Sequence, residues 1–128
     1  MEVQKIPVAF QDKRGEIIDV LKHGHVEYIT IIRSRKGAVR GNHYHKQTYQ
    51  HLYVMDGKLR VVSKMPGKDQ TEAVLVAGDL ILNVPDEHHA FEALEETTFL
   101  VLTRGPRGGE DYEKDTFRLD VPLITPRD

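Results

Sequence analysis

Short runs typical of β-strands follow one another along most of the chain, and segments that favour turns separate them. The runs are rich in β-branched and aromatic residues and span 3–10, 16–21, 26–33, 38–45, 50–55, 58–64, 71–77, 80–84, 89–94 and 97–103. No stretch keeps a helical apolar period over roughly 11 residues, so no long helix is expected. About ten strands in 128 residues predict an all-β single domain, either a sandwich or a small closed barrel.

One turn signal stands out among the connecting segments. Asp56-Gly57 lies between two runs of β-type residues, and a two-residue type I′ turn needs a positive φ at both central positions. Asp-Gly meets that need, so the sequence predicts a β-hairpin here.

Two histidines in the run 38–45 share one face of the expected strand. His43 and His45 stand at i and i+2, and an extended segment directs such side chains to the same side of a sheet. By the same alternation Gln50 faces the core with Leu52, and His89 faces it with the apolar residues of its own run. The pattern therefore predicts that His43, His45, Gln50 and His89 form one inward-facing set in a cavity.

This set is compatible with more than one kind of chemistry. Three neutral imidazoles and an amide oxygen suit a divalent transition metal, with Zn²⁺, Fe²⁺, Mn²⁺ and Ni²⁺ as candidates and His43, His45, Gln50 and His89 as ligands. Gln50 carries no charge, so it should hold the metal more weakly than a carboxylate would. The alternatives are a metal-free cavity whose polar groups are satisfied by hydrogen bonds or water, or a general base acting on a substrate.

The spacing of these residues resembles the cupin family. Gly37, His43, His45, Gln50 and Gly57 match the first cupin motif (residues 37–57), with Gln50 where that family usually has Glu. The segment 78–93 is similar to the second motif, since its glycine and its histidine, Gly78 and His89, match while three other positions depart. The resemblance implies one cupin domain over 1–128, a small β-barrel of the double-stranded β-helix or jelly-roll type.

A narrower resemblance points to cupins that act on nucleotide-linked deoxysugars. Arg40-Gly41-Asn42-His43-Tyr44-His45 followed by Gln50 is similar to the dTDP-4-keto-6-deoxyglucose ketoisomerases, the dTDP-4-dehydrorhamnose 3,5-epimerases and the cupin half of capsular polysaccharide reductases. The segment DYEKDTFRL is similar to the end of several sugar-epimerase-like cupins. The resemblance implies an isomerase or epimerase in polysaccharide biosynthesis that moves a proton next to a keto group.

Residue roles follow from that implied reaction. His43 or His45 would be the catalytic base, and Arg40 would hold a diphosphate or sugar oxygens. Tyr44, Tyr49 and Tyr53 are the candidate proton donors, with Arg40, Tyr44 and Tyr53 as the expected substrate-binding residues. A metal-dependent oxygenase or hydrolase, or a non-catalytic module that binds a sugar or a metal, are the alternative functions. The Gly-rich segment 104–109 lacks the ending of a phosphate loop and is expected to be an exposed loop.

Composition excludes several other classes of protein. A net charge of −2 gives no bulk attraction to nucleic acid or to a membrane surface, and the absence of Cys excludes disulfides and thiolate ligands. The N-terminus does not read as a secretory signal, so a cytoplasmic protein with a small-molecule ligand is expected. The resemblance implies a homodimer, because small cupins of this kind commonly pair, and the apolar segments VQKIPVAF and VPLITP at the two ends exceed what the barrel needs.

Overall fold

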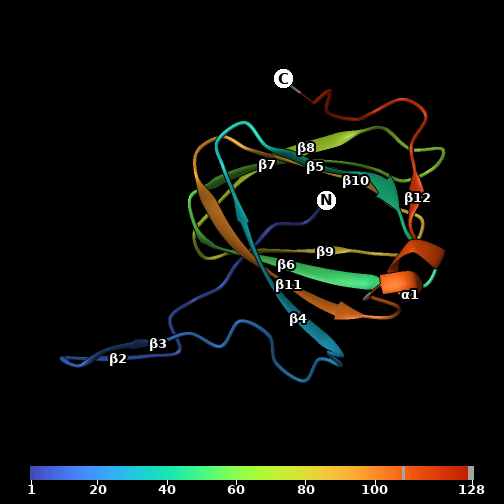
Figure 1. Cartoon of the computed structure of the whole chain (residues 1–128). Helices are drawn as coiled ribbons and strands as arrows, with labels where there is room; N and C mark the ends of the chain where they lie inside the picture. The colour runs from blue at the N-terminus through green and yellow to red at the C-terminus, as the bar shows by residue number, and fades with distance from the viewer. Residues whose placement is uncertain (108, 127–128) are drawn as a thin grey trace.

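Two five-stranded antiparallel sheets face each other and curl into a barrel (Figure 1). The computed structural model describes residues 1–107 and 109–126. The first sheet has the strand order β1-β9-β6-β11-β4, in which the strands are Gln4–Lys5, Asp79–Asn83, Tyr49–Asp56, Thr97–Arg104 and Tyr28–Ser34. The second has the order β12-β5-β10-β7-β8, with strands Phe117–Arg118, Val39–Tyr44, His88–Ala93, Lys58–Lys64 and Thr71–Val76. The expected all-β jelly-roll architecture is confirmed.

Alternation along the strands builds the core between the sheets. Leu52 and Val54 of β6 and Phe99 of β11 turn inward and are almost fully buried, as the period of two requires. Val61 of β7 and Phe91 of β10 meet them from the second sheet. The apolar core fills one end of the barrel, which leaves the other end for polar side chains.

The expected hairpin at Asp56-Gly57 is wrong. β6 and β7 belong to different sheets, so the chain crosses at Gly57 from one sheet to the other. Gly57 has a φ of 101°, whereas Asp56 does not have a positive φ. The corner is held by Thr97, whose hydroxyl donates to the carbonyl of Lys58 and accepts from its backbone N–H. Packing against β11 therefore decides the direction of the chain here.

The C-terminal segment lies on the outside of the second sheet. The side chain of Asn42 accepts hydrogen bonds from the backbone N–H groups of Leu123 and Ile124 and donates to the carbonyl of Ile124. Ile124 is buried against Val62 and Ala90 on that outer face. This end of the chain is therefore docked on its own barrel.

The N-terminal segment behaves differently. β2 (Phe10–Asp12) and β3 (Gly15–Ile17) pair only with each other and form a hairpin that stands off the barrel (Figure 1). Every residue of the two strands is exposed. One helix, α1 (Gly109–Lys114), lies at an end of the barrel, and no helix of the described part of the chain is long and apolar enough to cross a membrane.

The Gly57 corner gives a stability prediction. A Cβ at position 57 would lie 2.4 Å from the carbonyl oxygen of Glu96, so Gly57→Ala should distort the crossing. Gly67→Ala is the matched control, because Gly67 also has a positive φ, 79°, but a Cβ there would meet nothing within 4 Å. Urea unfolding should show that Gly57→Ala loses at least about 1 kcal/mol more than Gly67→Ala. Equal losses would mean that only backbone strain matters at the corner.

Candidate functional site

The polar end of the barrel holds a cavity of about 380 Å³. Its polar lining comes from Arg40 and His43 of β5, Gln50 of β6 and His89 of β10, together with Arg107 and Tyr112. Apolar residues of the core, among them Phe91 and Phe99, form its floor. Among the described residues that line this cavity, none is acidic.

A β-bulge in β5 decides which of its side chains enter the cavity. His43 pairs with His89 and Gly41 pairs with Ala90, so Asn42 is an extra residue between two registered pairs. Gly41 and Asn42 both have positive φ, 88° and 57°, and a Cβ on Gly41 would lie 2.9 Å from the carbonyl oxygen of His89. The extra residue shifts the in-and-out alternation of side chains along β5 by one position, so Arg40 faces inward together with His43.

Three imidazoles come together at the centre of the site. The ring centroid of His43 lies 4.8 Å from that of His45 and 4.7 Å from that of His89. One ring nitrogen from each histidine lies within 4.8 Å of the others. The three histidines that the sequence predicted to lie together therefore do so, and Gln50 lines the same cavity from β6 of the other sheet. His45 follows β5 directly, is 3% exposed and is not among the residues that line the cavity.

Backbone carbonyls fix the tautomers of two of these histidines. Nδ1 of His45 lies 2.7 Å from the carbonyl oxygen of Asp115, and Nδ1 of His89 lies 3.2 Å from that of Glu87. A carbonyl oxygen only accepts, so Nδ1 carries the proton in each neutral ring and Nε2 keeps its lone pair. Both Nε2 atoms are buried and have no hydrogen-bond partner in the described part of the chain. Two unprotonated nitrogens are thus free to accept from a ligand.

Burial keeps all three histidines neutral near pH 7. The pKa of His43 falls from its ordinary value of 6.5 to about 4, mainly through burial and then through the charges of His45 and Arg118. Burial also lowers the pKa of His45, although the hydrogen bond to Asp115 opposes it. The pKa of His89 falls well below 6.5 because of burial and then the neighbouring His43. Each ring is therefore available as a base or a ligand.

Asp115 connects the cavity to the segment that follows α1. The backbone carbonyl of Asp115 accepts a hydrogen bond from the His45 ring. Its buried carboxylate accepts hydrogen bonds from the backbone N–H groups of Lys46 and Gln47 and from the Thr48 hydroxyl. Burial raises the pKa of Asp115, but these hydrogen bonds outweigh it and the net shift is downward. One residue thus holds both the His45 ring and the loop that joins β5 to β6.

Two cavity residues were not assigned from the sequence. The ring centroid of Tyr112, on α1, lies 6.4 Å from that of His43 and 5.8 Å from that of His45. The guanidinium of Arg107 lies 5.1 Å from the centre of the Tyr112 ring and donates to the Thr30 hydroxyl. Position 108 lies outside the described residues, and the rest of the expected exposed loop at 104–109 brings Arg107 to the cavity. The DYEKDTFRL segment, which contains Tyr112, was the available signal.

The tyrosines expected at the substrate lie elsewhere, which corrects that assignment. Tyr44 faces away from the histidines and stacks on His88 and Phe117, as alternation along β5 requires. Tyr53 is buried on the face of β6 opposite to Gln50. Tyr49 also lies away from the cavity, under the guanidinium of Arg104. None of the three lines the cavity, whereas Arg40 does and donates from Nε to the Ser34 hydroxyl at its rim.

A jelly-roll barrel with a His-x-His pair and a third histidine on the neighbouring strand of the same sheet defines the class of this protein as a cupin. Within that class, the chain belongs to the family described as the polysaccharide biosynthesis C-terminal domain, whose model matches residues 10–103. A search of the curated proteins found no match.

Solved structures with the same fold include sugar 3,4-ketoisomerases and a 3,5-epimerase. The sugar 3,4-ketoisomerase QdtA from Thermoanaerobacterium thermosaccharolyticum, in complex with TDP, superposes with a TM-score of 0.75 at 19% identity, covering 93% of this chain and 88% of that one. A 3,4-ketoisomerase from Helicobacter canadensis gives 0.74 at 22%, covering 91% and 89%. The dTDP-4-dehydrorhamnose 3,5-epimerase from Sulfolobus tokodaii gives 0.70 at 23%, covering 84% and 70%. At these identities the likeness establishes the fold.

The depressed histidine pKa values give a prediction on stability. A histidine whose pKa is lower in the folded state takes up its proton first in the unfolded state, so the free energy of unfolding should fall as the pH drops from 6.5 toward about 4. Each such histidine contributes at most about 1.4 kcal/mol per pH unit. Urea unfolding at several pH values should show a smaller slope for His43→Gln than for the wild type.

The exposed His25 provides the control for that prediction, since His25→Gln should leave the slope unchanged. The contribution of Asp115 is separable, because a carboxyl group with a lowered pKa loses its stabilising effect only as the pH falls below its ordinary value of 3.8. An unfolding free energy that is flat between pH 7 and pH 4 would contradict the assignment of neutral buried imidazoles.

Proposed function

We propose that this chain is an isomerase or epimerase that acts on a nucleotide-linked keto-deoxysugar by proton transfer. The observation that carries the proposal is the composition of one cavity, in which neutral imidazoles, two guanidinium groups and a tyrosine line the same space and none of the described lining residues is acidic. Such a site favours a ligand that is anionic or that becomes anionic during the reaction.

The proton chemistry is assigned to His43 and Tyr112. A proton on the carbon next to a keto group is acidic, and a neutral imidazole can remove it while the electron pair moves to the keto oxygen. His43 lines the cavity directly and is neutral at pH 7, so it is the base in this proposal. Tyr112 stands on the helix beside it and has a phenol that can return a proton to carbon or to oxygen. The product would be a sugar whose keto group has moved to the neighbouring carbon, or a sugar with inverted configuration at that carbon.

The guanidinium groups supply the charge that this reaction needs. Arg40 and Arg107 both line the cavity, Arg40 at its rim and Arg107 over Tyr112. Arg107 also lowers the pKa of His43, together with His45 and Arg118, so a bound anion that offsets these charges would make His43 a stronger base. Substrate charge and base strength are thereby coupled.

The substrate class rests on the relatives with the same fold. One QdtA structure contains TDP and another contains TDP-4-keto-6-deoxyglucose. A cavity of about 380 Å³ fits a sugar ring, and Arg40 at the rim is placed to meet a diphosphate. The description of the matching family, polysaccharide biosynthesis, is in keeping with a sugar substrate.

The first test uses TDP-4-keto-6-deoxyglucose in deuterated water. NMR should show solvent deuterium entering the carbon next to the keto group, followed by a new keto sugar. His43→Gln and Tyr112→Phe should each lower turnover by about 10²–10⁴-fold, the range expected for loss of a general acid or base. Tyr112→Phe should still allow deuterium exchange, since the base remains.

Tyr44→Phe is the matched control, because Tyr44 lies on the same strand as His43 but outside the cavity. It should leave both exchange and turnover within about twofold of the wild type. Tight ligand binding with neither exchange nor turnover would instead identify a non-catalytic sugar-binding module. Normal turnover in His43→Gln would overturn the proposed role of the base.

We propose metal binding by His43, His45, Gln50 and His89 as a second candidate function, favoured by the two orphaned Nε2 atoms. Three imidazole nitrogens lie within 4.8 Å of one another, whereas two ligands of one ion at about 2.1 Å can be no more than about 4.2 Å apart. Small side-chain rotations would close this gap. The donor set suits Zn²⁺ or Ni²⁺, and a bound ion would supply a Lewis acid there.

Calorimetric titration with Zn²⁺ tests this function independently of turnover. Alanine at His43, His45 or His89 should weaken binding to a similar extent, because each removes one ligand, while affinity should fall with pH only as the pH approaches the lowered pKa of His43, about 4, where protons compete with the metal. Gln50→Glu should tighten binding at least tenfold, or about 1.4 kcal/mol, by adding a negative ligand. If the protein bound no metal and the three alanine variants lowered turnover to different extents, proton transfer would remain the role of the histidine cluster.

A further inference from the structure

A layer of polar side chains lies between the apolar core and the end of the barrel beside α1 (Figure 1). Each sheet contributes one row of cross-strand partners, which stand on the same inner face: Asn83, Gln50 and Thr103 in the first sheet, and Ser63, His89 and His43 in the second. Gln50 and His89 line the same cavity, so the two rows face each other across it. The next row of the first sheet, Ile81, Leu52 and Val101, already belongs to the core. We call the six polar residues the polar layer.

The polar layer holds most of the unpartnered buried atoms that the described part of the chain contains. Six buried side-chain atoms there have no hydrogen-bond partner. One of them, Oδ1 of Asp79, is instead paired with the ammonium group of Lys5 at 2.7 Å. The other five belong to side chains that are at most 3% exposed, namely those of Ser63, Asn83, His89 and Thr103 in the polar layer and of His45 beside it. Buried polar groups are almost always hydrogen-bonded, so this concentration requires a partner that reaches all of them.

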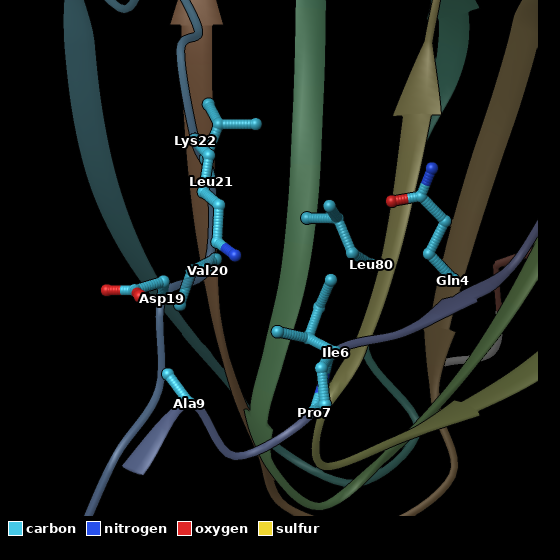
Figure 2. Close-up of a pocket in the computed structure, with 9 residues that line it drawn as sticks. All are labelled: Gln4, Ile6, Pro7, Ala9, Asp19, Val20, Leu21, Lys22 and Leu80. Atoms are coloured by element: carbon cyan, nitrogen blue, oxygen red, sulfur yellow. The ribbon is translucent and has the colours of Figure 1, made fainter.

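The cavity on the outer face of the first sheet differs in this respect. It is lined mainly by apolar side chains, among them Ile6 and Leu80 (Figure 2). The polar residues that line it, Gln4, Asp19 and Lys22, are exposed. None of the five unpartnered atoms belongs to its described lining. The unpartnered atoms are therefore a feature of the barrel interior and not of every hollow in the molecule.

The five atoms need hydrogen-bond donors more than acceptors. Nε2 of His45 and Nε2 of His89 only accept, because Nδ1 carries the proton in each ring. The amide nitrogen of Asn83 donates to the carboxylate of Glu87 at 3.1 Å, which leaves Oδ1 of Asn83 as a third acceptor. The two remaining atoms are hydroxyl oxygens, which can donate or accept, but none of the five is bonded to another. A bridging molecule must therefore supply most of the donors.

Water is the molecule that meets this demand. It donates two hydrogen bonds and accepts two, and an internal water typically joins about three buried polar groups. Ser63, Asn83, Thr103 and His45 do not line the cavity, so a larger ligand in the cavity meets them only through a smaller molecule. A metal ion at the imidazoles would serve the two Nε2 atoms and would leave the three oxygen atoms without a donor.

We infer that the polar layer is a hydration site, in which a few ordered water molecules bridge the two sheets and form the floor of the cavity. Gln50 and His89 belong both to the layer and to the cavity lining, so the waters nearest to them present hydrogen bonds to the cavity. A ligand with several hydroxyl groups, such as a sugar ring, binds to this floor through water. The hydration site stands on its own, whereas its use by a sugar rests on the proposed function.

Melting temperatures of isosteric variants test the hydration site. Thr103→Val keeps the shape of the side chain and removes its hydroxyl, so the bridging water loses a partner and the melting temperature should fall by at least about 3 °C. Thr98→Val is the matched control, because Thr98 lies on the outer face of the same strand, and it should lower the melting temperature by less than about 1 °C. A buried hydroxyl without a partner would be better replaced by valine, so an unchanged or raised melting temperature in Thr103→Val would overturn the inference.

A high-resolution crystal structure gives a readout that does not depend on stability. The wild type should show ordered water within about 3.2 Å of Oγ1 of Thr103 and of Oδ1 of Asn83. The Thr103→Val variant should lose the water next to position 103 and keep the one at Asn83. Direct pairing of the five atoms with one another, with no water between the two rows, would contradict the hydration site.

Two ligands that differ by the sugar test its role in recognition. In a His43→Gln background, in which turnover is blocked, Thr103→Val should weaken binding of TDP-4-keto-6-deoxyglucose about three- to tenfold, the loss of one water-mediated hydrogen bond. Calorimetry should show TDP affinity within about twofold, because TDP has no sugar ring to reach the floor. Equal losses with both ligands, or no loss with the sugar, would refute recognition through the water layer. If neither ligand binds, the proposed function fails, while the melting temperatures and the crystal structure still decide the hydration site.

Discussion

The pairing of β5 with β10 is the interaction on which the rest of the site depends. It sets His43 opposite His89 and, through the bulge at Gly41 and Asn42, turns Arg40 into the same cavity. A regular strand would have placed Arg40 on the outer face, away from the imidazoles. The bulge also directs Asn42 outward, where its side chain fastens the C-terminal segment. One extra residue therefore organises both faces of the sheet.

The chemistry of the site comes from desolvation, which the nearby carboxylates of Glu113 and Asp115 only partly offset. The three imidazoles are buried beside one another, and each opposes protonation of its neighbours, so they stay neutral. Two carbonyl groups, of Asp115 and Glu87, hold the protons on Nδ1 and leave the Nε2 lone pairs unsatisfied inside the protein. Buried acceptors without partners cost stability, which a structural core would avoid. Their presence in a cavity lined by guanidinium groups is what a ligand site requires.

The two ends of the chain contribute in opposite ways. The C-terminal third returns to the barrel and completes the cavity, with Arg107 and Tyr112 over the histidines and Asp115 beneath them. The N-terminal segment 1–17 begins with a strand in the first sheet and then leaves the barrel as an exposed hairpin. The sequence predicted that the apolar segments at both ends take part in a dimer interface. In the structure the two segments differ in how far their apolar side chains are buried. Ile124 is already packed, whereas Phe10 and Ile17 are not.

The sequence by itself determined the all-β class, the cupin motifs and the inward-facing set of His43, His45, Gln50 and His89, because these depend on local alternation and fixed spacing. Tertiary structure alone decided that Asp56-Gly57 joins two sheets, since a turn motif contains no information on which strand its neighbour will pair with. It also decided that Arg40 and Tyr112 face the imidazoles while Tyr44 and Tyr53 do not. The position of Arg40 depends on a bulge whose register is set by the pairing of β5 with β10. The position of Tyr112 depends on α1, and the residue that follows this helix, Asp115, contacts His45, which is 70 residues away in sequence. Spacing fixes which side chains share a strand face, and only the pairing of distant segments fixes what those faces meet.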